Sequence, residues 1–75
     1  METATLQEYF LQQMQKYSIT ATFYLVNGFQ FKGVVQAFDR YVVAVECEGA
    51  QELIYKHAIS TIVPQQRIDI SAWNS

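Results

Sequence analysis

The chain has 75 residues, which is enough for one domain at most. Such a small domain buries a limited share of its surface and often depends on oligomerisation, a metal or disulfides. An apolar fraction of 51% predicts that part of the apolar surface is buried between subunits. Five basic and seven acidic residues give a net charge of −2. This balance excludes nucleic-acid binding through overall positive charge and leaves only a local site.

Cysteine content and the N-terminal sequence point to the cell compartment. Cys47 is the only cysteine, which excludes a disulfide within one chain and a cysteine-based zinc site and indicates a reducing compartment. The start METATLQEYF has no basic segment followed by an apolar core, and no apolar run approaches the ~18 residues that cross a bilayer. We therefore expect a soluble, cytoplasmic protein without membrane contact.

The first predicted element is a helix over about residues 6–17. Thr5-Leu6-Gln7-Glu8 fits a capping box, in which the threonine and glutamate side chains each accept a hydrogen bond from the other residue's amide. Apolar residues follow at spacings of three and four: Leu6, Tyr9, Phe10, Met14 and Tyr17. This apolar stripe predicts that the helix covers a sheet.

A strand pair is predicted next. Residues 19–26 alternate with a period of two and are rich in β-branched and aromatic side chains. Asn27-Gly28 is the strongest short hairpin signal, because both residues tolerate the positive φ of a type I′ turn, and residues 29–38 should return antiparallel. Gly33 inside the second strand predicts a bulge or a sharp bend.

Three further strands complete the predicted sheet, at residues 41–45, 51–56 and 60–63, with Pro64 closing the last. One helix and five short strands predict a mainly β fold, a small and strongly bent antiparallel barrel, over residues 1–64. Residues 65–75 are polar apart from Ile68, Ile70 and Trp73, so we expect a poorly ordered C-terminal tail.

No catalytic signature is present. The sequence has no Ser-His-Asp or Cys-His arrangement in a recognisable motif and no glycine-rich phosphate loop. His57 is the only histidine, and a metal there would need ligands from other chains. We therefore expect no enzymatic activity, no cofactor and no metal site.

The residue types of the candidate binding residues also fit purely structural roles. The segment YKHAIST, from Tyr55 to Thr61, places Lys56 beside His57 between two predicted strands. Such a turn is most often a solvated corner, and the strand aromatics Tyr24, Phe29 and Tyr41 equally fit a barrel core or rim. Residue types alone leave both the binding and the structural interpretation open.

Several segments together resemble Hfq, the family of bacterial Sm-like RNA chaperones: Leu6-Gln7, the stretch YLVNGF from Tyr24 to Phe29, Phe38-Asp39 and, most specifically, YKHAIST. The resemblance runs from about residue 6 to 64, and NGFQ with Glu48-Gly49 is similar to the version found in Gram-positive bacteria. It implies an Sm-like (SH3-like), five-stranded, strongly bent antiparallel barrel with an N-terminal helix. It also implies a homohexameric ring formed by edge-strand pairing, which would remove open sheet edges.

The resemblance implies a first RNA site at the pore, on the face that carries the helices. In this site Lys56 and His57 line the pore, Tyr41 stacks on each base, and Gln7 supplies the hydrogen bonds that distinguish uracil. Tyr55 is expected to hold a subunit contact through its hydroxyl. Because stacking contributes about 1–3 kcal/mol per base, repetition around a ring would bind U-rich single strands despite the negative net charge.

A second RNA site is implied on the opposite face, where the family holds purines of A-rich tracts. The matching residues are Tyr24, Leu25, Gly28, Phe29 and Gln30, with Phe31 adding apolar packing nearby. A glycine beside an aromatic ring suits this role, because it lets a base approach the backbone closely while the ring stacks.

The rim departs from the family pattern. Many Hfq proteins carry several arginines near the helix end that promote pairing of two RNAs, whereas this chain reads Gln15-Lys16-Tyr17-Ser18 with Lys16 as its single cation. We therefore expect an RNA chaperone that binds small RNAs and mRNAs in post-transcriptional regulation but anneals them weakly. The alternative is an SH3-like protein-interaction ring or peptide-binding barrel that uses the same aromatic surfaces without any RNA function.

Overall fold

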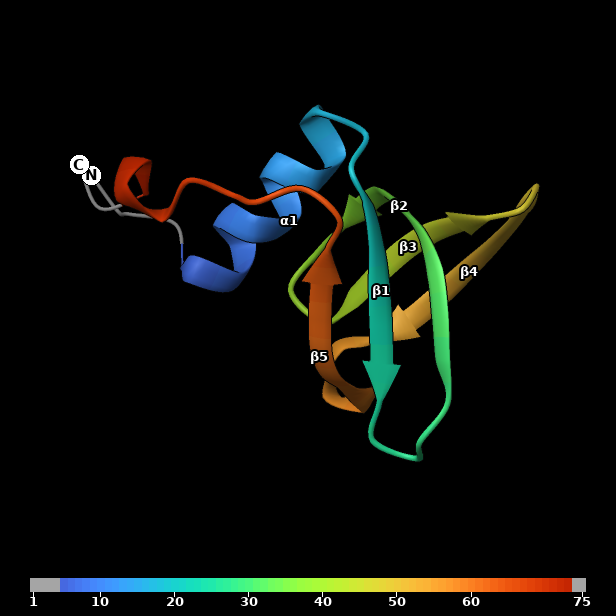
Figure 1. The fold of residues 1–75 in the computed structure, drawn as a ribbon. Helices are drawn as coiled ribbons and strands as arrows, with labels where there is room; N and C mark the ends of the chain where they lie inside the picture. Colours follow the sequence, from blue (N-terminus) through green and yellow to red (C-terminus); the bar gives the residue numbers. More distant parts are fainter. Residues whose placement is uncertain (1–4, 74–75) are drawn as a thin grey trace.

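The computed structural model describes residues 5–73 (Figure 1); residues 1–4 and 74–75, which the predicted domain and tail included, lie outside the described part. The first element is helix α1, Leu6–Lys16. Its predicted capping box is present: the Thr5 amide donates to the Glu8 carboxylate (3.0 Å), and the Glu8 amide donates to the Thr5 hydroxyl (3.1 Å). Leu11 and Met14 form the buried side of the helix.

Five strands follow the helix: β1 Thr20–Leu25, β2 Gln30–Phe38, β3 Val42–Cys47, β4 Ala50–Tyr55 and β5 Ile59–Pro64. They form one antiparallel sheet in the order β4-β3-β2-β1-β5. The sheet curls strongly, with α1 at one end of it (Figure 1). The predicted mainly β architecture, with one N-terminal helix and a bent five-stranded sheet, is therefore confirmed.

The core lies between the helix and the inner face of the curled sheet. Its fully buried side chains include Phe23, Leu11, Met14, Val43 and Val45. The two ends of the sheet, β4 and β5, have a strand neighbour on one side only. Each therefore keeps an open row of backbone groups in the single chain.

Of the bulge or sharp bend expected at Gly33, the bulge is not present at this residue. It pairs regularly with Ala21 of β1, and the irregularity of β2 lies between Val35 and Ala37, opposite β3. A Cβ at Gly33 would lie 2.5 Å from the Glu46 carbonyl oxygen and would also overlap Val45. The glycine is required because the backbone of β3 approaches β2 closely at this position.

The type I′ turn predicted at Asn27-Gly28 is wrong. Of these two residues only Gly28 has a positive φ (95°), and its amide donates to the Leu25 carbonyl (3.0 Å). The Asn27 side chain instead accepts from the Phe29 amide (3.1 Å), within the loop of residues 26–29 that joins β1 to β2. Positive φ at both central residues occurs in the β3–β4 turn, at Glu48 (51°) and Gly49 (84°).

The segment after β5 differs from the expected poorly ordered tail. Ile68 is only 8% exposed and belongs to the core, and a short 3₁₀ turn, η2, spans Ile70–Ala72. The Tyr9 hydroxyl of α1 donates to the Asp69 carbonyl (2.8 Å). The packed domain therefore continues beyond Pro64, because an apolar residue in the tail completes the core beside the helix.

Candidate functional site

The Lys-His segment forms a 3₁₀ turn, η1, Lys56–Ala58, between β4 and β5. The Lys56 amide donates to the carbonyl of Tyr41 (2.8 Å), which joins this turn to the β2–β3 loop. The Lys56 ammonium lies 5.7 Å from the centre of the Phe38 ring. The structure thus brings together Tyr41 and Lys56, which are far apart in the sequence.

Asp39 shapes the loop that presents Tyr41. Its carboxylate accepts hydrogen bonds from the amides of Tyr41 (2.7 Å) and Val42 (2.9 Å). These two bonds, the Tyr41 bond first, lower the pKa of Asp39 below its usual value because they favour the charged form. The Tyr41 ring is 68% exposed, so a flat ligand can reach it.

Arg40 is a neighbour that the sequence analysis did not single out. Its guanidinium lies 5.9 Å from the centre of the Tyr41 ring. A cation at this distance from an aromatic ring is attracted by the electron-rich face. In the sequence, only the position of Arg40 directly before Tyr41 in a predicted turn indicated that the two side chains could be neighbours.

His57 stacks on Tyr55 of the preceding strand, with ring centres 5.7 Å apart and planes inclined by 26°. Tyr55 is exposed on the edge strand β4. Its predicted subunit contact stays a prediction for a single chain.

Gln7 lies in the first turn of α1 and lines a surface depression of about 340 Å³ together with Leu6, Phe10 and residues 59–62 of β5. The next residue, Glu8, has a lowered pKa, first because of its hydrogen bonds with Thr5 and to a smaller extent because of the positive charge of Lys56.

The second predicted set gathers at the hairpin between β1 and β2. Tyr24 pairs with Gln30 across the two strands, and Gly28 and Phe29 lie in the connecting loop. The Phe29 ring is 71% exposed and Leu25 is half-buried. Phe31 is instead directed toward the core and stacks on the buried Phe23, with ring centres 5.3 Å apart. This contact packs β2 against β1 next to the hairpin loop.

The rim residue Lys16 lies in the last turn of α1, with its ammonium 5.3 Å from the centre of the Tyr17 ring. The depression next to it, about 690 Å³, is lined by Gln15, Ser18, Glu46 and Glu48 among others. Its charged lining residues are therefore both acidic.

Residues 5–73 contain neither a metal-ligand cluster nor a membrane-spanning helix. No group of three or more His, Cys, Asp or Glu side chains in this range could hold a metal ion. No helix in the same range has the length and apolar character needed to span a membrane.

Known proteins resemble both the sequence and the fold. The model of the Hfq protein family matches residues 6–69 of the chain. The chain belongs to the Hfq family. The match extends beyond Pro64 and includes the buried Ile68.

Two relatives illustrate how close the Hfq resemblance is. The RNA-binding protein Hfq of Shouchella clausii is 50% identical over 68 residues, which cover 91% of this chain and 88% of that protein. The RNA-binding protein Hfq of Bacillus thuringiensis is 48% identical over 69 residues, which cover 92% and 93% of the two chains.

A solved structure supports the same conclusion for the fold. The crystal structure of the pleiotropic translational regulator Hfq superposes with a TM-score of 0.77 and 42% sequence identity, over 79% of this chain and 98% of that chain. The expected Sm-like Hfq fold is therefore confirmed.

Proposed function

We propose that this chain is an RNA chaperone that acts by binding single-stranded RNA in the cytoplasm and supports regulation of mRNAs by small RNAs. Membership of the Hfq family supports this function, because the similar proteins of S. clausii and B. thuringiensis are RNA-binding proteins. The role requires no chemical step, since exposed aromatic rings and local cations suffice to hold a single strand.

The observation that carries the proposal is the hydrogen bond between the Lys56 amide and the Tyr41 carbonyl. It joins the backbone of an exposed aromatic residue to that of a lysine, and an aromatic ring and a cation are the two groups that hold a base and its phosphate. His57 follows Lys56 in the same turn, and Gln7 lies in the depression at the helix start, where it is available to hydrogen-bond uracil.

We further propose that six copies form a ring and that its pore collects these side chains into a site for U-rich RNA. The open edges of β4 and β5 support this assembly, because pairing one with the other in the next copy closes a ring without leftover edges. The β1–β2 hairpin set, with Phe29 exposed, is proposed to bind A-rich RNA on the opposite face.

Aromatic and lysine substitutions test the proposal. Lys56→Ala and Tyr41→Ala should weaken binding of oligouridine while leaving oligoadenosine unchanged, and Phe29→Ala should do the reverse. We expect the Tyr41 and Phe29 losses to be about five- to 150-fold, because stacking contributes about 1–3 kcal/mol per base. Fluorescence anisotropy with labelled oligonucleotides measures both affinities.

Tyr17→Ala is the matched control, since Tyr17 is also an exposed aromatic residue but belongs to neither proposed site. It should change neither affinity. Equal losses for both RNAs in all three site variants would show that the two sites are not separate. If the wild-type chain binds neither RNA but does bind peptides, the alternative protein-interaction function is correct.

A further inference from the structure

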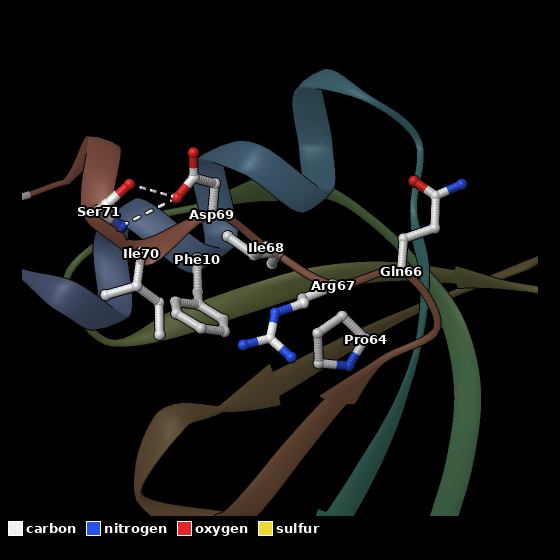
Figure 2. Close-up of a pocket in the computed structure, with 8 residues that line it drawn as sticks. All are labelled: Phe10, Pro64, Gln66, Arg67, Ile68, Asp69, Ile70 and Ser71. Atoms are coloured by element: carbon white, nitrogen blue, oxygen red, sulfur yellow. Dashed lines mark hydrogen bonds between the residues drawn. The ribbon is translucent and has the colours of Figure 1, made fainter.

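The segment after β5 forms one wall of a groove that the proposed RNA sites do not include. This tail groove has a volume of about 460 Å³ and is lined by Phe10 of α1, Pro64 at the end of β5, and Arg67 and Ile70 of the tail, among others (Figure 2). A volume of this order is in the range of small-ligand sites. Its lining combines apolar surface with one cation.

The tail groove is part of the fold and not a chance arrangement of a loose segment. The Gln65 amide donates to the Thr20 carbonyl (2.9 Å), Ile68 is buried in the core, and the Tyr9 hydroxyl donates to the Asp69 carbonyl (2.8 Å). Arg67 lies between these anchor points. Its backbone is therefore placed in advance, which lowers the ordering cost of a contact through its side chain.

Arg67 keeps its donors available. Figure 2 shows the Arg67 side chain lying between Phe10 and Pro64, whereas the Asp69 carboxylate is directed toward Ser71. That carboxylate accepts from the Ser71 amide (3.0 Å) and hydroxyl (2.6 Å). Within residues 5–73, Arg67 has no hydrogen bond or ion pair with another residue. The one acidic side chain of the groove is thus occupied locally and leaves the guanidinium to a ligand.

The tail groove borders the proposed helix-face site at Phe10. Phe10 lines both the tail groove and the depression that contains Gln7, Ser60 and Thr61. A strand of RNA that leaves the Gln7 depression past Phe10 would therefore reach Arg67 next. A guanidinium is well suited to a phosphate, and half-buried apolar side chains suit a ribose or base edge.

We propose that the tail groove binds the nucleotides that flank a pore-bound RNA segment, with Arg67 holding a backbone phosphate and Phe10 and Ile70 contacting the sugar or base. This inference rests on the proposed RNA-binding function and deepens it. In this proposal the tail is part of the RNA-binding surface. The affinity for RNA should therefore rise when the strand extends beyond the segment bound at the pore.

Affinity for two RNAs tests the inference with the full-length protein. One probe is an oligouridine of about six nucleotides, and the other is the same strand extended by about six cytidines. Arg67→Gln should weaken the extended strand about three- to tenfold and change the short one by less than about twofold. The slope of log K against log salt for the extended strand should fall by about 0.7 for each phosphate that the variant no longer neutralises.

Arg67→Lys and Gln66→Ala are the controls. Lysine keeps the charge and should restore part of the affinity, while Gln66 lines the same groove without a charge and its replacement should have little effect. Because Arg67 and Gln66 are both exposed, neither change removes a core side chain.

Three results with Arg67→Gln would each overturn the inference. Arg67→Gln could leave the extended strand unchanged, or it could weaken both strands equally. It could also lower the mass of the oligomer, which would place Arg67 in the interface between copies of the chain. If the wild-type protein binds short oligouridine but gains nothing from the extension, this inference fails while the proposed function stands. If it binds neither strand, both fail.

Discussion

Asp39 is the residue that links the local structure to the proposed pore site. Its carboxylate caps the amides of Tyr41 and Val42, and the Tyr41 carbonyl in turn accepts from Lys56. We propose that Asp39 acts by positioning the loop that carries Tyr41 and, through it, the Lys-His turn. A side chain without a hydrogen-bond acceptor at position 39 would no longer hold the Tyr41 loop in place, nor the Lys-His turn that is bonded to it.

We predict that Asp39→Ala weakens oligouridine binding without affecting oligoadenosine, whereas Asp39→Asn, which keeps one acceptor oxygen, retains most of the affinity. Anisotropy titrations measure both, and melting curves check folding. Normal oligouridine binding by Asp39→Ala would show that the loop holds its shape without the cap.

The pH dependence of this cap has a definite sign. Hydrogen bonds lower the pKa of Asp39 in the folded state below the ordinary value of 3.8. The carboxylate therefore stabilises the loop at every pH above that value, and this contribution is lost as the pH falls through the lowered folded pKa. Asp39→Asn should remove this part of the acid sensitivity, which acid titration of the melting temperature would detect.

At the level of elements, the packing of β2 against β3 depends on the missing side chain of Gly33. We predict that Gly33→Ala lowers the free energy of unfolding by about 1–3 kcal/mol, because the new methyl group meets Val45 and the Glu46 backbone. Urea denaturation followed by circular dichroism measures the change.

Gly49→Asn is the control for this prediction. Gly49 lies in the β3–β4 turn, where its Cβ position has no atom within 4 Å, and asparagine is among the side chains least strained at a positive φ such as its 84°. The control should cost much less than Gly33→Ala. An equal loss in both variants would mean that space between the strands is not the cause.

The edge strands are the elements on which the proposed assembly depends. β4 exposes Leu53 and Tyr55, and β5 exposes Val63, although a chain of this size needs to bury apolar surface. We predict that the chain sediments as a hexamer of about 52 kDa, six times its 8.7 kDa. Leu53→Asp should shift the mass downward, because it places a charge in the proposed interface between copies.

Val26→Asp is the matched control for the mass measurement. Val26 is as exposed as Leu53, 68% against 61%, but lies in the β1–β2 loop and not on an edge strand. It should leave the mass unchanged. A stable monomer of the wild-type chain at micromolar concentration would contradict ring assembly.

For the whole molecule, net charge sets how RNA approaches. Six copies at −2 each would carry −12. Long-range attraction of RNA would then be absent or reversed, so binding would depend on stacking and hydrogen bonds at preformed sites. Glu46 and Glu48 beside the end of α1 add local repulsion at the rim.

We therefore predict slow annealing of two complementary RNAs by the wild-type chain and faster annealing by a Gln15→Arg, Tyr17→Arg variant with unchanged oligouridine affinity. Position 17 is preferred to position 18, because Ser18 has a positive φ of 51° at which an arginine is strained. Strand-pairing kinetics with labelled RNAs measure this. Strong annealing by the wild-type chain that survives Lys16→Ala would place this activity elsewhere on the molecule.

The local signals in the sequence were sufficient for the elements and for the family. The capping box at Thr5 and the period-two strands depend on neighbouring residues only, so these predictions hold in the folded chain, and the YKHAIST segment was specific enough to indicate the Hfq family. One local contact was also missed, because the Asn27 side chain accepts from the Phe29 amide and replaces the expected turn. Contacts between distant residues decided the rest: β3 approaches β2 closely at Gly33, and Ile68 lies in the core although its segment is mostly polar. Each of these outcomes depends on which surfaces meet across the fold, and residue spacing along the chain does not contain that information.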